Sequence, residues 1–410
     1  MTAQSLFYSI IGIIILEFLW DTYLDYLNAQ HYADAIPPEL EGIYNPEEYQ
    51  QSQSYLRTNY RFSSISSLFS LLMVLLFFFL NGFALLDTWI RGITVNPIYI
   101  SLLFIGILVL ANTLISIPFD YYHTFVIEEK FGFNKTTLKT FCLDKLKGIL
   151  LMLILGGGIL YLILWFYEKT GTHFWIYAWI LISVFSVFIS MFYSSLIVPL
   201  FNKQKALEAG ELRDAIQQFA QKTGFTLDAI YVIDGSKRST KANAYFSGFG
   251  PKKRIVLYDT LINDLDTDEI VGVLAHEIGH YKMKHTRYHI IASIVTTGIT
   301  LYLLSIFIDN PLLAAALGVA TPGFHIGIIV FGILYSPISE IIGLFMNIIS
   351  RKFEYQADSF AKTNYSGTAL ITALKKLSKN ALSNLTPHPY YVFVHYSHPT
   401  LLQRIRKLAS

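Results

Sequence analysis

Seven long apolar segments dominate the hydrophobic pattern of the chain. They cover residues 6–23, 65–86, 98–117, 149–167, 174–200, 288–308 and 326–349. A helix of roughly 20 residues satisfies its own backbone while it crosses about 30 Å of hydrocarbon, so each segment predicts a membrane-spanning helix. Glu17 and Asp21 shorten the uncharged part of the first segment. We expect this segment to remain as an anchor, because residues 1–5 carry no positive charge and no signal-peptide cleavage site follows.

The distribution of positive charge supports this topology. Seven spans place the termini on opposite sides of the membrane, and all but two of the 31 Lys and Arg residues then lie on the side of the C-terminus. The two exceptions are Arg91 and Lys169. Because loops rich in Lys and Arg stay in the cytosol, the sequence predicts an outside or lumenal N-terminus and a cytosolic C-terminus.

The composition agrees with a membrane protein and limits the metal chemistry. Hydrophobic residues make up 53% of the chain and charged residues only 15%, whereas a soluble domain usually has about 25% charged residues. The net charge of +2 creates no overall field that would attract nucleic acid. The single cysteine, Cys142, excludes an internal disulfide, a cysteine-rich zinc finger and an iron–sulfur cluster. Any metal ion must therefore bind to His, Asp or Glu.

The two longest segments outside the predicted spans have the periodicity of folded protein. Residues 205–222 predict an amphipathic helix, residues 229–233 and 254–258 predict short strands, and residues 243–249 predict an extended stretch between them. Residues 266–269, with the sequence Asp-Thr-Asp-Glu, supply capping groups for a helix that continues to about residue 284.

His276, Glu277 and His280 form the pattern His-Glu-x-x-His on that capped helix. Two histidines four residues apart lie on one face of a helix, one turn from each other, so both rings can reach one metal ion. Glu277 can then act on the attacking water as a general base. The alternative is a helix with two surface histidines and a solvated Glu, but the position directly before a membrane span favours a zinc site.

A catalytic zinc ion needs a third protein ligand and one open position. Glu354 and Asp358 are four residues apart, follow the last span, and lie on the same predicted side of the membrane as the His-Glu-x-x-His helix. We expect Glu354 to bind the metal and Asp358 to accept a hydrogen bond from a ligand histidine. A random acidic pair would belong to a solvated helix face, but the incomplete zinc site favours the ligand role.

The order of these motifs resembles that of the type I CAAX prenyl endopeptidases, which are integral-membrane zinc proteases. His-Glu-x-x-His is followed by Glu-x-x-x-Asp after the last span and by Ser397-His398-Pro399 near the C-terminus. Four further segments agree: WDTY at 20–23, FGFNK at 131–135, NAYF at 243–246 and RIVL at 254–257. The resemblance thus extends from residue 15 to about residue 407.

The resemblance implies a bundle of seven helices that encloses a large chamber, closed on the cytosolic side by the zinc domain. It implies that Asn243 positions a substrate strand beside the metal, in the strand-addition mode of peptide recognition. It also implies that His398 contacts the substrate or the developing oxyanion, with Arg404 as a supporting residue. Cleavage would remove the last three residues of a C-terminal CAAX sequence whose cysteine carries an isoprenoid.

The expected fold is mainly α-helical, a seven-transmembrane-helix bundle that encloses a chamber, with a cytosolic zinc metalloprotease domain that contains a small β-sheet. The expected function is a membrane endopeptidase with one Zn²⁺ per chain, bound by His276, His280 and Glu354. Its partners would be a peptide or protein substrate and the lipid bilayer, without nucleic acid. Two alternatives stay open: a quality-control metalloprotease of membrane proteins, and a transporter or receptor, which would need no complete set of zinc ligands.

The expected division assigns residues 1–200 to five membrane helices with their loops, 201–287 to a catalytic segment, 288–349 to the last two spans and 350–410 to a second catalytic segment. A bacterial inner membrane is favoured over the endoplasmic reticulum, because the C-terminal RKLAS is no lysine-based retrieval signal and the chain is compact for the eukaryotic family. Three other histidines, His285, His289 and His325, lie off the ligand spacing, and we expect interfacial or structural roles for them.

Overall fold

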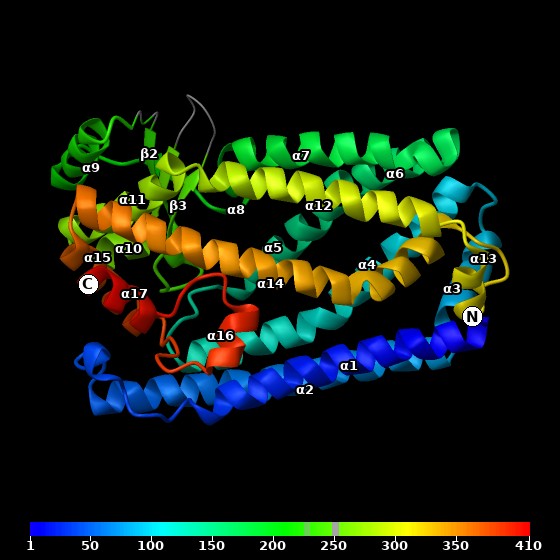
Figure 1. The fold of residues 1–410 in the computed structure, drawn as a ribbon, viewed down its shortest axis with the longest axis horizontal. Helices are drawn as coiled ribbons and strands as arrows, with labels where there is room; N and C mark the ends of the chain where they lie inside the picture. The colour runs from blue at the N-terminus through cyan, green and yellow to red at the C-terminus, as the bar shows by residue number, and fades with distance from the viewer. Residues whose placement is uncertain (226, 228, 248–253) are drawn as a thin grey trace.

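The computed structural model describes residues 1–225, 227, 229–247 and 254–410. Long helices run side by side along the molecule, and the strands gather with several shorter helices at one end (Figure 1). The long helices are α1 (Ala3–Gln30), α2 (Pro46–Phe79), α4 (Pro97–Tyr122), α6 (Gly157–Thr170), α7 (Phe174–Leu196), α12 (His285–Phe307) and α14 (Phe324–Asn364). The other helices in this part of the chain are α3 (Gly82–Arg91), α5 (Leu138–Leu151), α8 (Val198–Phe201) and α13 (Pro311–Ala316).

Within the described residues, six helical stretches are long and apolar enough to cross a membrane. The longest, Leu138–Phe201, has 64 residues, which at 1.5 Å per residue is about 96 Å and far exceeds one crossing. The chain reverses inside this stretch at Gly171, whose φ of 54° is a conformation that glycine adopts readily. Helices α6 and α7 then pack against each other. With two membrane passes in this stretch, the described part of the chain has seven, the number predicted.

The predicted span 65–86 is wrong in its C-terminal part. Helix α2 ends at Phe79, and Asn81 has a φ of 54°, which breaks the helix before α3 begins. A Cβ on Gly82 would lie 2.4 Å from the ring of Phe77, so a larger residue here would force that ring to move. Hydropathy does not register this break, because Asn and Gly change the backbone direction without lowering the hydrophobicity of the segment much.

The sheet has four strands in the order β1-β2-β4-β3, with bounds β1 (Gln204–Ala206), β2 (Ala229–Ile233), β3 (Ala244–Ser247) and β4 (Arg254–Tyr258). Strands β2 and β4 are parallel, whereas β1 and β3 pair antiparallel with their neighbours. Strand β3 is therefore an edge strand. The bounds predicted for β2 and β4 are confirmed. The predicted helix 205–222 is wrong at its start, where β1 lies, and α9 covers only Glu211–Lys222. Residues 248 and 249 of the predicted extended stretch lie outside the described residues.

Helix α11 (Thr267–Lys282) forms the centre of the domain at this end. Its N-cap is Asp266, and the Glu269 side chain accepts a hydrogen bond from the Asp266 backbone N–H at 2.9 Å, which completes a capping box. Helix α14 packs closely on α11 at Gly279, which has no side chain. A Cβ added there would lie only 3.1 Å from the Cα of Ala357. The remaining helices of this domain are α10 (Asp259–Asp264), α15 (Gly367–Asn380), α16 (Pro389–His395) and α17 (Leu401–Ala409).

A buried polar network joins helices at the opposite end of the bundle, where α3 and α13 lie (Figure 1). The Nε2 of His325 is 2.9 Å from Oδ1 of Asp87, and its Nδ1 is 3.0 Å from Oγ of Ser101. Arg91 donates from Nε to the other carboxylate oxygen of Asp87 at 2.7 Å. These contacts tie α3, α4 and α14 together, in line with the structural role expected for His325.

Candidate metal centre

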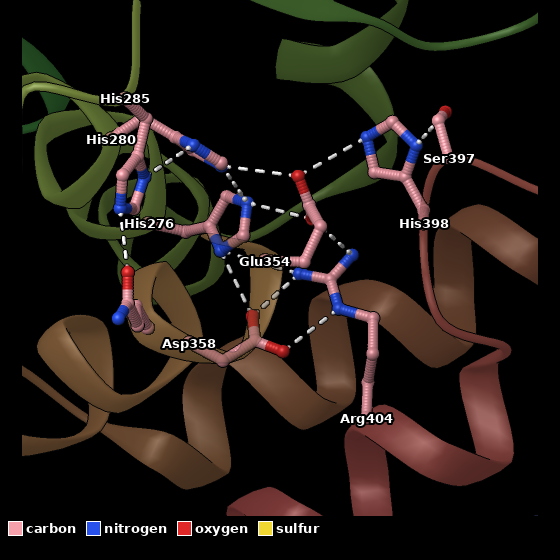
Figure 2. A network of polar contacts seen from close by, with 9 residues as sticks. His276, His280, His285, Glu354, Asp358, Ser397, His398 and Arg404 are labelled. Atoms are coloured by element: carbon pink, nitrogen blue, oxygen red, sulfur yellow. Dashed lines mark hydrogen bonds and ion pairs between the residues drawn. The ribbon is translucent and has the colours of Figure 1, made fainter. Parts of the chain in front are cut away.

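Helices α11 and α14 bring three predicted ligands to one point. One ligand atom each from His276, His280 and Glu354 lies within 4.8 Å of the others. The Nε2 of His276 is 3.4 Å from Oε2 of Glu354, and the Nε2 of His280 is 3.2 Å from Oε1 of Glu354. Figure 2 shows both rings and the carboxylate converging from the two helices. The histidines meet because they are one turn apart on α11, and Glu354 meets them because α14 packs on that helix.

The arrangement fits a bound cation. The Nε2 atoms of His276 and His280 are only 3.1 Å apart, close to the distance of about 3.3 Å expected between two nitrogen ligands of a tetrahedral zinc ion. Oε2 of Glu354 is buried and has no hydrogen-bond partner among the residues that the structure describes. A buried carboxylate oxygen that accepts no hydrogen bond is costly, and a metal ion between these atoms removes that cost.

Electrostatics favour a positive charge at the same point. Burial disfavours the charged form of His276, but the adjacent carboxylates of Asp358 and Glu354 outweigh burial and raise the pKa of His276 to about 9. The protein thus stabilises a cation beside these carboxylates.

Asp358 and Arg404 contact Nδ1 of His276, the ring nitrogen that does not face Glu354. Nδ1 of His276 lies 2.9 Å from Oδ1 of Asp358. Arg404 donates to both oxygens of Asp358, from Nη2 at 2.6 Å and from Nε at 2.9 Å. The Asp358 side chain is fully buried, so its charge depends on this pairing. Asp358 therefore lies where the sequence predicts a partner for a ligand histidine.

His398 approaches Glu354 from the C-terminal segment. Its Nε2 is 3.2 Å from Oε1 of Glu354, and 61% of its side chain is exposed. The hydroxyl of Ser397 lies 2.9 Å from Nδ1 of His398. Arg351 of α14 donates to the backbone carbonyls of Val392 and Tyr396, which holds α16 just before this segment. The sequence offered no sign of this anchoring role for Arg351.

The sequence also missed a direct partner of a ligand histidine. His285, expected to be interfacial or structural, places its Nδ1 3.1 Å from Nδ1 of His280. Its Nε2 lies 2.9 Å from Oε1 of Gln356. The spacing of five residues from His280 hid this contact, because residues i and i+5 of one continuous helix point about 140° apart.

A cavity of about 570 Å³ opens beside the three ligands. Glu277 and His398 line it, as do Asn243 and two residues of the edge strand β3, Ala244 and Phe246. The side chain of Asn243 is exposed, and its Oδ1 accepts a hydrogen bond from the backbone N–H of Ala244 at 2.8 Å. An acid beside the ligands and an edge strand along one wall suit the binding and hydrolysis of an extended peptide.

Comparison with known proteins gives the family. Residues 25–203 match the family model of the CAAX prenyl protease N-terminal region with five membrane helices, and residues 206–410 match that of peptidase family M48. The chain belongs to peptidase family M48. As an M48 peptidase with a buried His-His-Glu group, it is a membrane metalloprotease, and the alternative of a transporter or receptor is wrong.

The M48 relatives match almost the entire chain. CAAX prenyl protease 1 of Saccharomyces cerevisiae is 37% identical over 97% of this chain and 94% of its own length. The CAAX prenyl protease 1 homologue of Homo sapiens is 32% identical over 96% of this chain and 93% of its own length. The crystal structure of Ste24p from S. mikatae superposes with a TM-score of 0.93 at 36% identity, and the match covers 99% of both chains. These M48 relatives are eukaryotic, so the preference for a bacterial inner membrane has no support.

Proposed function

We propose that this chain is a zinc-dependent endopeptidase that removes the last three residues from CAAX sequences whose cysteine carries an isoprenoid. The cavity that joins the His-His-Glu group to Glu277 and to the edge strand is the observation that carries the proposal. The full-length similarity to proteins named CAAX prenyl proteases supports the substrate class.

Zinc is the metal that this ligand set favours, because two His and one carboxylate with an open position are typical of catalytic zinc. Zinc bound there would act as a Lewis acid on the scissile carbonyl and lower the pKa of the attacking water. Glu277 takes the proton of that water and passes it to the leaving amine. Its place in the cavity wall, next in sequence to the ligand His276, supports this role.

His398 acts on the developing oxyanion. The Ser397 hydroxyl can donate to Nδ1 of His398, which leaves the ring proton on Nε2, the atom that is near Glu354 at 3.2 Å. An N–H donor in this place can stabilise the negative charge of the tetrahedral intermediate. Arg404 orients the His276 ring mainly through Asp358, because its two shortest contacts go to that carboxylate. Its Nη2 also lies 3.3 Å from Nδ1 of His276.

The substrate backbone extends the sheet at β3. An edge strand offers unpaired N–H and C=O groups to an extended peptide, and β3 forms part of the cavity wall. Asn243 precedes this strand and orients the peptide near the scissile bond. The active site and the C-terminus face the cytosol in this proposal, as the distribution of Lys and Arg indicates.

The test is cleavage of one CAAX peptide, with and without a farnesyl group, by the purified full-length protein. We expect release of the terminal tripeptide from the farnesylated form only, and no release by the variant Glu277→Ala. Equal metal-dependent cleavage of both forms would contradict prenyl-directed specificity and favour a broader membrane-protein protease. Undiminished activity of Glu277→Ala would contradict its role as the general base.

A further inference from the structure

His285 contacts the ligand His280 on the side away from Glu354, as Figure 2 shows. We propose that His285 is a positioning residue for the metal centre: a neutral imidazole that fixes the tautomer and the orientation of His280. The inference rests on the zinc site proposed above and adds to it a residue that the ligand motif does not contain.

The direction of the hydrogen bonds follows from Gln356. The structure places Oε1 of Gln356 2.9 Å from Nε2 of His285, and because an amide oxygen accepts, this arrangement puts the His285 proton on Nε2. A neutral His285 then has a lone pair on Nδ1, which accepts a hydrogen bond from Nδ1 of His280 at 3.1 Å. His280 is thereby left with a free lone pair on Nε2. This is the atom that faces Glu354 and the Nε2 of His276.

The two ligand histidines have partners of different charge. His276 contacts the ionised Asp358, which Arg404 pairs. On the side away from Glu354, Nδ1 of His280 contacts His285, which in turn contacts the uncharged Gln356. The carboxylates of Glu277, Glu354 and Asp358 already lie at or beside this centre, so a neutral relay orients the second ring without another buried negative charge.

The fold brings His285 to this place through a break between two helices. Helix α11 ends at Lys282, and Lys284 has a φ of 63°, a left-handed conformation that starts α12 in a new direction. The ring centroids of His280 and His285 then lie 5.1 Å apart. Phe353 of α14 stacks on His285 with a centroid distance of 4.1 Å and an interplanar angle of 8°, which restricts rotation of the ring.

Three substitutions separate the positioning role from a packing role. His285→Asn keeps an acceptor near the place of Nδ1, so it can still accept the hydrogen bond from His280. His285→Gln keeps a polar group only near the place of Nε2, so it can contact Gln356 but loses the hydrogen bond from His280. His285→Phe keeps the ring that stacks on Phe353 and removes both nitrogens. The measured quantity is the zinc affinity of the metal-depleted full-length protein in detergent, determined by competition with a chelator of known affinity.

We expect zinc affinity to fall by about 10- to 100-fold in His285→Phe and His285→Gln, the usual effect of losing a partner of a ligand histidine. His285→Asn should stay within a few-fold of wild type. The peptidase kcat at saturating zinc should follow the same order, with the Asn variant rescued. Unchanged affinity in all three variants, or equal loss in all three, would overturn the proposal, because a packing role does not distinguish Asn from Gln.

Two controls keep the outcomes distinct. Thermal unfolding of each metal-free variant shows whether the domain is folded, and Gln356→Leu provides a second, less invasive variant that should lower zinc affinity by loosening the His285 tautomer. Unchanged affinity in Gln356→Leu would contradict the relay.

Wild-type protein that fails to bind one zinc ion would refute the metal centre itself, and with it the role of His285. A wild-type protein that binds zinc while the variants bind equally well would refute only the inference on His285.

Discussion

Arg404 and Asp358 form a two-point contact between the C-terminal helix α17 and the helix that carries Glu354. Nη2 and Nε of Arg404 lie 2.6 and 2.9 Å from the two oxygens of Asp358. Asp358 in turn contacts Nδ1 of His276. The last helix of the chain is therefore part of the metal centre, although it supplies no ligand, and the geometry of His276 depends on it.

We predict that Arg404→Met costs about 3–5 kcal/mol of unfolding free energy, because it leaves the buried charge of Asp358 without its guanidinium partner. The loss should appear as a lower midpoint in thermal unfolding of the purified protein. Arg406→Met is the matched control, since Arg406 pairs with Glu39 and is 59% exposed. Its effect should stay below about 1 kcal/mol. Equal effects of both substitutions would show that the buried pair is not critical.

Glu277 and Glu354 should respond differently to the same isosteric change. Glu277→Gln removes a general base and should lower kcat by about 10²- to 10⁴-fold while zinc content stays unchanged. Glu354→Gln removes a charged ligand and should lower zinc content together with activity. Elemental analysis of the purified variants beside the peptide assay separates the two effects. Zinc loss in Glu277→Gln, or full zinc content in Glu354→Gln, would reverse the assignments.

The contacts of Lys241 should make the free energy of unfolding depend on pH in the alkaline range. Its Nζ lies 2.8 Å from Glu128 and 3.0 Å from the Tyr55 hydroxyl. Burial lowers the pKa of Lys241, but these two contacts outweigh burial and hold it above the ordinary value of 10.5. Because the folded state has the higher pKa, this stabilisation is complete below pH 10.5 and is lost as the pH rises through the folded value.

We therefore expect the stability difference between wild type and Lys241→Met to shrink as the pH rises above 10.5. Denaturant unfolding at a series of pH values measures this difference. The exposed Lys237 provides a control, since Lys237→Met should leave the pH profile parallel to that of wild type. A difference that is constant across the alkaline range would show that the Lys241 charge is not the stabilising feature.

The buried network at the far end of the bundle should matter for stability rather than for turnover. Asp87 and His325 are 4% and 1% exposed, and Arg91 shares the same carboxylate. Asp87→Ala removes the carboxylate that both His325 and Arg91 contact and should cost about 3–5 kcal/mol. The molecules that remain folded should keep the kcat of wild type in the peptide assay, since the network lies at the end of the bundle away from the zinc domain (Figure 1). A lower kcat at equal folded fraction would indicate coupling between the two ends.

Local patterns in the sequence predicted a large part of the site. His276 and His280 are joined by the helical repeat, and Asp266 with Glu269 marks the start of their helix. The strands at 229–233 and 254–258 follow from short runs of β-branched and aromatic residues. These features need only neighbours within a few residues, so the sequence is sufficient to reveal them.

Breaks in the backbone escaped this reasoning. Asn81 ends one long apolar helix early, and Lys284 turns the chain between α11 and α12. Both are non-glycine residues with positive φ, a conformation that few non-glycine residues adopt and that even Asn, the more tolerant of the two, adopts only where the surrounding packing favours it. The contact between His280 and His285 follows from the second break, which is why a search by helical spacing did not find it.

The sequence by itself determined that this is a membrane protein, which residues could bind a metal, and in what order the motifs occur, because hydrophobicity and side-chain chemistry belong to single residues and short repeats. Tertiary structure alone decided which groups meet. Glu354 lies 78 positions after His276 in the chain and Arg404 is 128 positions after it, and both reach that histidine only because α14 packs on α11 and α17 packs on α14. Contacts over such separations depend on how whole helices pack, and no local pattern records that packing.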